Sequence, residues 1–279
     1  MRGTRLGVLA AAGAFLSTLA LVAACGTPSA AAVSTLPQTP DTPAPTATSI
    51  VRPAATPQSA VGAIFGGDAD DLGDHFCSGS VIDSPAGDVV MTAAHCVADG
   101  DGTPAHTGQS FVPGYHDGTV PYGVWTVQSA YVDQHFLDNA DPDFDVAFLT
   151  VVPDNGAPAI QDVTGGFGVA LDPGTGDQVQ AIGYPIRINA PTTRSGVTKL
   201  YSPTQLELPA PGLENGTSGG PWLRDSASGL QIVGVTGGYE QGGYDFDTSY
   251  STYLSPDFGT LEAQAVGDSD STTVNRASG

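Results

Sequence analysis

Residues 215–221 read Asn-Gly-Thr-Ser-Gly-Gly-Pro, which places Ser218 among glycines just before an apolar stretch. Backbone N–H groups at such a tight turn can be aimed at a developing negative charge, because no side chains intrude. A serine hydroxyl is a poor nucleophile at neutral pH, so it needs an imidazole to take its proton and a carboxylate to orient that imidazole. The run therefore predicts a nucleophilic serine that depends on a histidine and a carboxylate elsewhere in the chain.

Two upstream stretches offer these partners. The run Thr-Ala-Ala-His-Cys carries His95, and the run Asp-Val-Ala-Phe-Leu begins at Asp145. Asp141 and Asp143 lie nearby, but only Asp145 leads directly into an apolar run that can hold a carboxylate away from water. We therefore expect His95 to act as the base, Asp145 to orient it and Ser218 to be the nucleophile.

The order of these residues along the chain separates two kinds of serine hydrolase. Residues 216–220 also fit the Gly-x-Ser-x-Gly elbow of α/β-hydrolases, in which the histidine follows the serine. All five histidines precede Ser218, so the elbow interpretation is excluded. Apart from His95, the histidines stand among glycine, proline or acidic residues, and we expect them at the surface: His75, His106, His116 and His135.

Beyond residue 59, short apolar runs alternate with clusters of Gly, Asp, Asn and Pro, a pattern typical of many short antiparallel strands. The helical pattern that stands out begins at residue 256, where Phe258, Leu261 and Ala265 recur at helical spacing. The predicted strands are residues 61–65, 76–82, 89–92, 122–132, 146–152, 178–184, 199–206, 232–236 and 250–254.

Over residues 61–265, the three blocks occur in the order of the catalytic blocks of the chymotrypsin-like (trypsin-fold) serine peptidases, and the chain resembles that family. The resemblance implies an all-β fold of two antiparallel six-stranded β-barrels and a short C-terminal helix. The first barrel would span residues 59–160 and carry His95 and Asp145. The second barrel, with the helix, would span residues 161–266 and carry Ser218, so that the catalytic cleft lies between the barrels.

The resemblance also implies an activity and a set of supporting residues. It implies a serine endopeptidase that hydrolyses a protein or peptide substrate through an acyl-enzyme. The N–H groups of Gly216 and Ser218 would form the oxyanion hole, and Cys77 and Cys96 would form a disulfide beside the histidine. A different class of function stays open: a surface binding module on the same scaffold, with an intact triad and an occluded cleft.

By the same resemblance, the substrate pocket is lined by Thr236, Gly237, Gly238 and Tyr239, and residues 237–239 would pair with the peptide backbone as an added strand. Animal digestive members have an aspartate before the nucleophile and an Ile-Val-Gly-Gly-like start, whereas this chain has Thr217 and no such start. It therefore looks more like the bacterial glutamyl-endopeptidase-like branch. Glutamate-cleaving members carry a histidine where Thr236 stands, so a preference for glutamate is not supported. Members that cleave after Arg or Lys keep an aspartate where residues 210–213 stand, and these residues include none, although Glu214 is close, so that preference is not supported either.

The N-terminus has the features of an export signal over residues 1–24, with two arginines followed by an alanine- and leucine-rich run. The run Val-Ala-Ala-Cys ending at Cys25 resembles a bacterial lipobox, which would place a lipid on Cys25. Ordinary cleavage nearby and an uncleaved anchor stay open. We expect an exported protein, either held at the outer face of the bacterial cell membrane by the lipid or secreted.

Residues 25–58 are rich in Pro, Thr, Ala and Ser and have too few large apolar side chains to form a core. They are interpreted as an extended tether, with a removable propeptide as the alternative. Residues 267–279 are polar, and we expect a disordered tail there.

The chain has 29 acidic and 8 basic residues and a formal net charge of −21. A surface of this sign repels nucleic acid and anionic lipid, so we expect no nucleic-acid partner and membrane contact only through a lipid at Cys25. We expect a monomer without a cofactor or metal. Two acidic loops, residues 68–71 and 99–102, leave a structural calcium ion open as an alternative, although neither fits the twelve-residue loop with its terminal glutamate.

Overall fold

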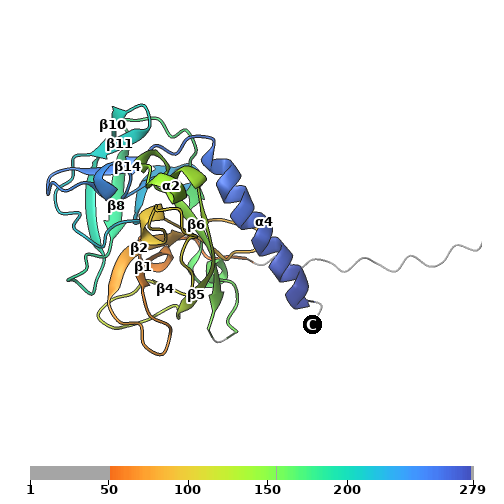
Figure 1. The fold of residues 1–279 in the computed structure, drawn as a ribbon. Helices are drawn as coiled ribbons and strands as arrows, with labels where there is room; N and C mark the ends of the chain where they lie inside the picture. The colour runs from red at the N-terminus through yellow and green to blue at the C-terminus, as the bar shows by residue number, and fades with distance from the viewer. Residues whose placement is uncertain (1–50, 155, 278–279) are drawn as a thin grey trace, which may run out of the picture. The chain divides into compact units, whose positions relative to one another are not determined.

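The computed structural model describes residues 51–154 and 156–277, so the predicted export signal and Cys25 lie outside the described residues. Strands dominate the first half of the described chain (Figure 1). The elements of this half are α1 (Pro57–Ala60), β1 (Val61–Phe65), β2 (His75–Val81), β3 (Val89–Thr92), η1 (Ala94–Cys96), β4 (Ser110–Pro113), β5 (Trp125–Val132), α2 (Gln134–Asn139), η2 (Pro142–Phe144) and β6 (Ala147–Pro153).

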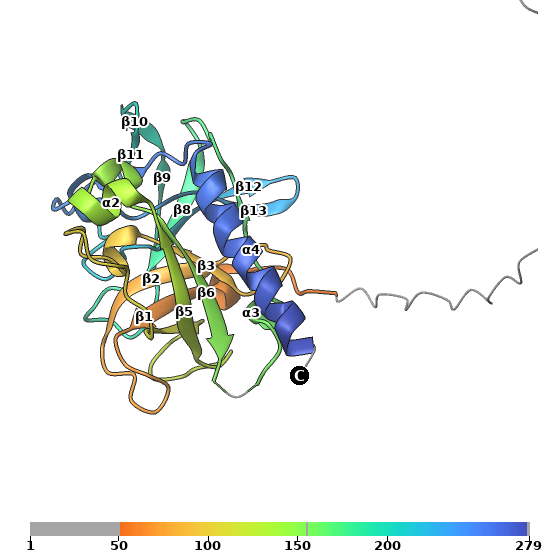
Figure 2. The ribbon, with the colours of Figure 1, turned by 45° about the vertical axis from the view of Figure 1, so that its right-hand side comes forward.

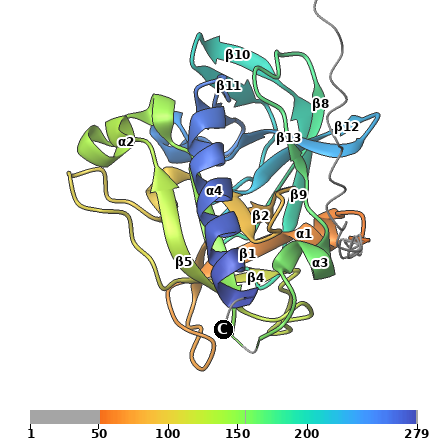
Figure 3. The same cartoon turned by 90° about the vertical axis from the view of Figure 1, so that its right-hand side faces the viewer.

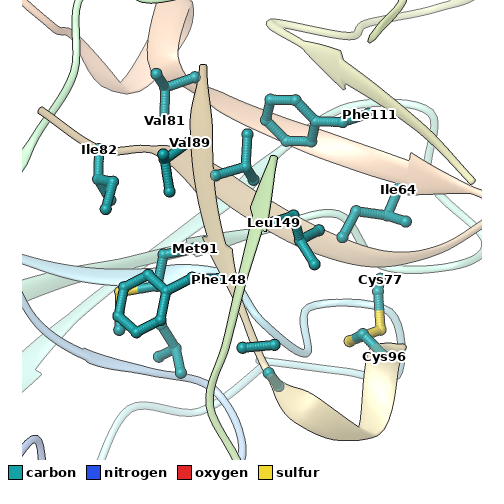
Figure 4. Close-up of a cluster of buried hydrophobic side chains, with 14 of the residues drawn as sticks. Ile64, Cys77, Val81, Ile82, Val89, Met91, Cys96, Phe111, Phe148 and Leu149 are labelled. Carbon is teal, nitrogen blue, oxygen red and sulfur yellow. A yellow bond between two sulfur atoms is a disulfide. The ribbon is translucent and has the colours of Figure 1, made fainter. Parts of the chain in front are cut away.

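The six strands of this half form a closed antiparallel barrel in the order β1-β2-β3-β6-β5-β4. The predicted first barrel is therefore confirmed. Its strands are short apolar runs whose side chains are buried (Figure 4), and Phe111, Phe148 and Leu149 are fully buried. Burial of each such side chain stabilises the fold by about 1.5–3 kcal/mol. This barrel carries the two segments that present His95 and Asp145.

The second half contains two sheets. One has five strands in the order β7-β13-β12-β8-β9, and the other has three strands in the order β10-β11-β14. The all-β class is confirmed, whereas closure of the second half into a six-stranded barrel stays a prediction. The elements are α3 (Ile160–Thr164), β7 (Gly168–Val169), β8 (Gln178–Gly183), β9 (Thr192–Val197), β10 (Lys199–Ser202), β11 (Gln205–Leu208), β12 (Pro221–Ser226), β13 (Gly229–Val235), η3 (Tyr239–Gly242), β14 (Ser249–Thr252) and α4 (Phe258–Ala277).

Helix α4 packs against β3, β5 and β6 of the barrel (Figures 2 and 3). Phe258, Leu261 and Ala265 are buried, as their helical spacing predicts. The helix continues to Ala277 and so overlaps the predicted tail at residues 267–279. After Ala265 the sequence has no apolar periodicity, so the pattern alone could not place this end. In the described part of the chain, no helix has the length and apolar character needed to cross a membrane.

The segment before β1 is fixed to the barrel within the region predicted as a tether. Arg52 donates hydrogen bonds to the side chains of Asp162 and Gln161 and to the carbonyls of Ser84 and Pro85. Thr56 then caps α1. The anchored segment therefore begins before the predicted boundary at residue 59. The sequence did not indicate this, because the acceptors that the guanidinium binds come from separate stretches of the chain.

Candidate active site

The imidazole of His95 and the carboxylate of Asp145 form a close pair. Nδ1 of His95 lies 2.7 Å from Oδ2 of Asp145, and the backbone N–H of His95 donates to Oδ1 at 2.9 Å. His95 lies in η1, directly after β3, while Asp145 follows η2 and leads into β6. Strands β3 and β6 are neighbours in the barrel, with Thr92 paired to Ala147, and this pairing brings the two side chains together.

The Cys77–Cys96 disulfide, which the resemblance implied, lies beside this pair and joins β2 to η1. Its Cα atoms are 6.1 Å apart. Because Cys96 is the residue after His95, the cross-link restrains the short helix that presents the imidazole. In the described chain, Cys77, His95 and Cys96 are the one group of at least three His, Cys, Asp or Glu side chains that lie close enough together to hold a metal ion. The two cysteine sulfurs are joined in the disulfide, so neither is a thiolate that could bind a metal.

The carboxylate of Asp145 is buried, with 1% of the residue exposed, and it accepts a third hydrogen bond from the second half of the chain. The N–H of Gly238 donates to Oδ2 at 2.7 Å. A Cβ on Gly237 would lie 3.0 Å from the same oxygen and 3.2 Å from Cβ of Ala93. Glycine at this position therefore lets the predicted substrate-binding segment approach the carboxylate closely.

Ser218 lies at the end of a turn that packs against the strand leading to His95. Its carbonyl accepts a hydrogen bond of 2.7 Å from the N–H of Ser78. The next residue, Gly219, has φ +77°, and an added Cβ there would collide with Oγ1 of Thr92. The serine turn thus packs against Thr92, three residues before His95 in the chain. In the described chain, the Ser218 hydroxyl and Nε2 of His95 are not joined by a hydrogen bond, and such bonds in ligand-free sites often tighten only when substrate binds.

The predicted substrate-binding segment, residues 236–239, follows β13 and ends at the first residue of η3. Oγ1 of Thr236 accepts a hydrogen bond from the indole of Trp222, so this hydroxyl helps to fix the segment. The ring of Tyr239 packs against Tyr201 and Tyr250, with centroids 4.9 and 5.0 Å away. The hydrogen bond with Tyr201 and the charge of Glu240 raise the pKa of Tyr239 to about 12. The sequence did not indicate this three-tyrosine cluster, because its members come from three separate elements.

A cavity of about 530 Å³ lies beside the serine turn. Its walls come from three segments, residues 186–187, 213–215 and 243–246. The exposed rings of Tyr244 and Phe246 and the side chain of Ile186 stand at its edge. Sequence reasoning did not single out these residues, since two of the segments are loops without a catalytic pattern.

Of the four other histidines, one contradicts the expected surface position. His75 is 2% exposed, because it begins β2 and packs edge-on against Phe65, Tyr115 and Tyr184. Desolvation lowers the pKa of this imidazole below 6.5, against the opposing effects of the Ile188 backbone and of Asp74.

The two acidic loops use their carboxylates locally. Oδ1 of Asp68 accepts the N–H groups of Asp70 and Asp71, and Oδ1 of Asp101 accepts the N–H and the hydroxyl of Thr103. The hydrogen bond from the Thr103 side chain is the main cause that lowers the pKa of Asp101. Both arrangements are hydrogen-bonded turns of the kind that Asp side chains commonly form.

The chain is similar to proteins of known structure. A family model described as a trypsin-like peptidase domain matches residues 77–235. The protease Anisep from Arthrobacter nicotinovorans is 28% identical with a TM-score of 0.65, over 78% of this chain and 100% of that one. The thermostable serine protease AL20 from an extremophilic microorganism is 22% identical with a TM-score of 0.63, over 77% of this chain and 98% of that one. A Glu endopeptidase in complex with MPD is 20% identical with a TM-score of 0.59, over 77% and 93% of the two chains. The search of curated proteins found no match.

The two lower-identity structures show the fold alone, whereas the family model spans more than half of the 279 residues. Its match includes the stretches that carry His95, Asp145 and Ser218. A peptidase of this family acts on peptide substrates, and the disulfide fits an oxidising compartment. The chain therefore belongs to the trypsin-like peptidase family, as a serine peptidase.

Proposed function

We propose that this serine peptidase is an endopeptidase whose catalytic residues are Ser218, His95 and Asp145. The observation that carries the proposal is the buried Asp145 carboxylate, which holds Nδ1 of His95 at 2.7 Å and also binds the backbone of Gly238. A carboxylate in this position fixes the tautomer of the imidazole, leaving Nε2 free to accept a proton.

The proposed reaction has two stages. Oγ of Ser218 attacks the peptide carbonyl while Nε2 of His95 takes the serine proton, and the tetrahedral intermediate develops a negative oxygen. The N–H groups of Gly216 and Ser218 would bind that oxygen, and the C–N bond breaks as His95 returns the proton to the leaving amine. Water then attacks the acyl-enzyme in the same way and releases the acid product. Asp145 stabilises the imidazolium at each stage without taking its proton.

Substrate binding is proposed for residues 236–239. The segment Gly237–Tyr239 would pair with the peptide backbone as an added strand, which places the scissile bond near the serine turn. Thr236, the residue after β13, is held by Trp222 and would form part of the pocket wall.

A fluorophosphonate probe tests the proposal, because it reacts with an activated serine. We expect one label on the wild-type protein, located at Ser218 by peptide mass spectrometry, and hydrolysis of an internally quenched peptide. Ser218→Ala should abolish both. Ser228→Ala, which removes an exposed hydroxyl from the turn between β12 and β13, is the control and should retain both. Folded wild-type protein that neither reacts with the probe nor cleaves peptides would instead favour the binding module with an occluded cleft.

We propose further that the protein acts outside the cytoplasm. The disulfide and the sequence of residues 1–24 support export, and the run ending at Cys25 supports a lipid on that cysteine. Mass spectrometry of the mature N-terminus tests the lipid directly. A first residue of Cys25 with a diacylglyceryl mass is expected, and an unmodified first residue other than Cys25 contradicts the lipoprotein.

A further inference from the structure

Ser78 makes four hydrogen bonds, two of which connect the first barrel to the serine turn. It lies in β2 and is fully buried. Its hydroxyl donates to the carbonyl of Gly216 and accepts the N–H of Tyr184, both at 2.8 Å. Its own N–H donates to the carbonyl of Ser218 and its carbonyl accepts Oγ1 of Thr92, both at 2.7 Å. One side chain of the first barrel thus holds the turn that carries the nucleophile.

The orientation of each peptide in this turn follows from its hydrogen bonds. In a planar trans peptide, the C=O and the following N–H point in opposite directions. The carbonyl of Asn215 accepts the N–H of Ile186 at 2.9 Å, so the N–H of Gly216 points away from Ile186. The carbonyl of Gly216 is held by Ser78, and the next N–H, that of Thr217, donates to the carbonyl of Glu214 at 3.0 Å.

The same reasoning extends to the nucleophile. The carbonyl of Thr217 accepts the N–H of Gly220 at 3.0 Å, so the N–H of Ser218 points the other way. Among the residues that the structure describes, the N–H groups of Gly216 and Ser218 have no acceptor, although their neighbours at 217, 219 and 220 do. Gly216 is buried and Ser218 is half-buried, and buried backbone donors are almost always paired, so two donors without an acceptor in this turn are available to a ligand oxygen.

We propose that Ser78 is a positioning residue that holds the oxyanion hole in its open form through its hydrogen bond to the Gly216 carbonyl. The inference rests on the proposed function, in which the N–H groups of Gly216 and Ser218 bind the oxyanion. Gly216 has φ +96° and no side chain, so its own conformational preferences do not hold this orientation. Without the Ser78 hydroxyl, the buried carbonyl of Gly216 loses its donor, which favours rotation of the peptide planes on either side of Gly216.

A second serine on the same strand supplies a matched control. Ser80 lies two residues further along β2, on the same face, and is also fully buried. Its hydroxyl has no hydrogen-bond partner in the described chain. Ser80→Ala therefore removes the same atom from the same strand without releasing the serine turn.

The test compares Ser78→Ala with Ser80→Ala on a chromogenic peptide and with a peptide trifluoromethyl ketone, which forms an anionic adduct at the nucleophile. Loss of a whole oxyanion donor lowers kcat by about 10²–10³-fold, so for this indirect effect we expect a fall of about 10–100-fold. KM should stay within about twofold, because the ground-state substrate does not need the oxyanion hole, and ketone affinity should weaken by a factor similar to that in kcat. Ser80→Ala should leave all three values near those of the wild type.

Two further variants keep the test valid if Ser78→Ala does not fold. Ser78→Thr and Ser78→Val have nearly the same shape, and only the threonine keeps a hydroxyl. The threonine variant should exceed the valine variant by about tenfold in kcat and in ketone affinity. The inference about Ser78 would be overturned if the threonine and valine variants had equal kcat and ketone affinity, or if Ser78→Ala matched Ser80→Ala in both values. This holds even if Ser218→Ala is inactive, because that result concerns the proposed function and not Ser78. A wild-type protein with no peptidase activity would overturn the proposed function itself.

Discussion

Oδ2 of Asp145 accepts hydrogen bonds of 2.7 Å from both Nδ1 of His95 and the N–H of Gly238. The first bond joins residues that lie next to strands β3 and β6 of the closed barrel, and the second comes from the segment after β13. The carboxylate therefore fixes the imidazole and the substrate-binding segment to one another. A displacement of either half would disturb the charge that orients the proposed base.

Asp145→Asn should lower kcat by about 10⁴-fold, the size of effect that an amide causes in a Ser-His-Asp triad. All three hydrogen bonds to the Asp145 carboxylate come from N–H groups. In asparagine, the NH₂ group replaces one of the two oxygens, so it must either face one of these N–H donors or force His95 into the wrong tautomer. Steady-state hydrolysis of a peptide substrate measures the effect. Asp143→Asn is the control, because the Asp143 carboxylate accepts a hydrogen bond from Gln205 rather than from His95, and this variant should keep kcat within about threefold. Comparable losses in both variants would contradict the assigned role of Asp145.

Removal of the disulfide by Cys77→Ala with Cys96→Ala should lower the free energy of unfolding by about 2–4 kcal/mol, since the two cysteines are 19 residues apart and cross-linking a loop restricts the unfolded chain. Urea unfolding followed by circular dichroism measures this change. Wild-type protein with reductant should shift by a similar amount, whereas the double variant should not respond to reductant. An unchanged unfolding midpoint in the double variant would show that the cross-link contributes nothing to stability.

The residues with a distinctive chemical pattern were the ones that the sequence located best. The three proposed catalytic blocks could be recognised because each combines a reactive side chain with small or apolar neighbours, and the structure brings His95 and Asp145 into contact. Strands with continuous apolar runs, such as β1 and β3, were predicted at their observed bounds. In both cases the information is local.

Features that depend on distant partners could not be read in this way. Strand β9 reads Thr-Thr-Arg-Ser-Gly-Val and has an alternating half-exposed pattern, so it lacks the apolar signal of a strand and is held by pairing with β8. His75 is buried by three aromatic rings from other segments. Ser78 has no recognisable pattern, yet it bonds to a turn 138 residues away. Tertiary contacts decide these positions.

Arg52→Ala should lower the free energy of unfolding by about 1–3 kcal/mol, because four acceptors around the guanidinium lose a donor. Chemical denaturation measures the loss, and limited proteolysis should cut residues 51–58 faster. Arg194→Ala is the matched control, since this arginine is half-exposed like Arg52 and also donates to backbone carbonyls but does not hold the N-terminal segment. Equal effects of the two variants would indicate that the Arg52 contacts do not anchor the segment.

The buried imidazole of His75 should make the protein less stable as the pH falls below about 7. Burial lowers its pKa in the folded state below 6.5, so between 6.5 and the folded value the unfolded chain binds a proton that the native protein does not. The free energy of unfolding therefore falls over this interval, by at most about 1.4 kcal/mol per pH unit for one proton, and this contribution becomes constant below the folded pKa. His75→Phe should remove this part of the slope and keep the aromatic packing, whereas His116→Gln, at an exposed position, should retain it. Urea unfolding at several pH values between 5 and 7.5 measures the slopes, and identical slopes for His75→Phe and the wild type would show that His75 is protonated equally in the folded and unfolded states.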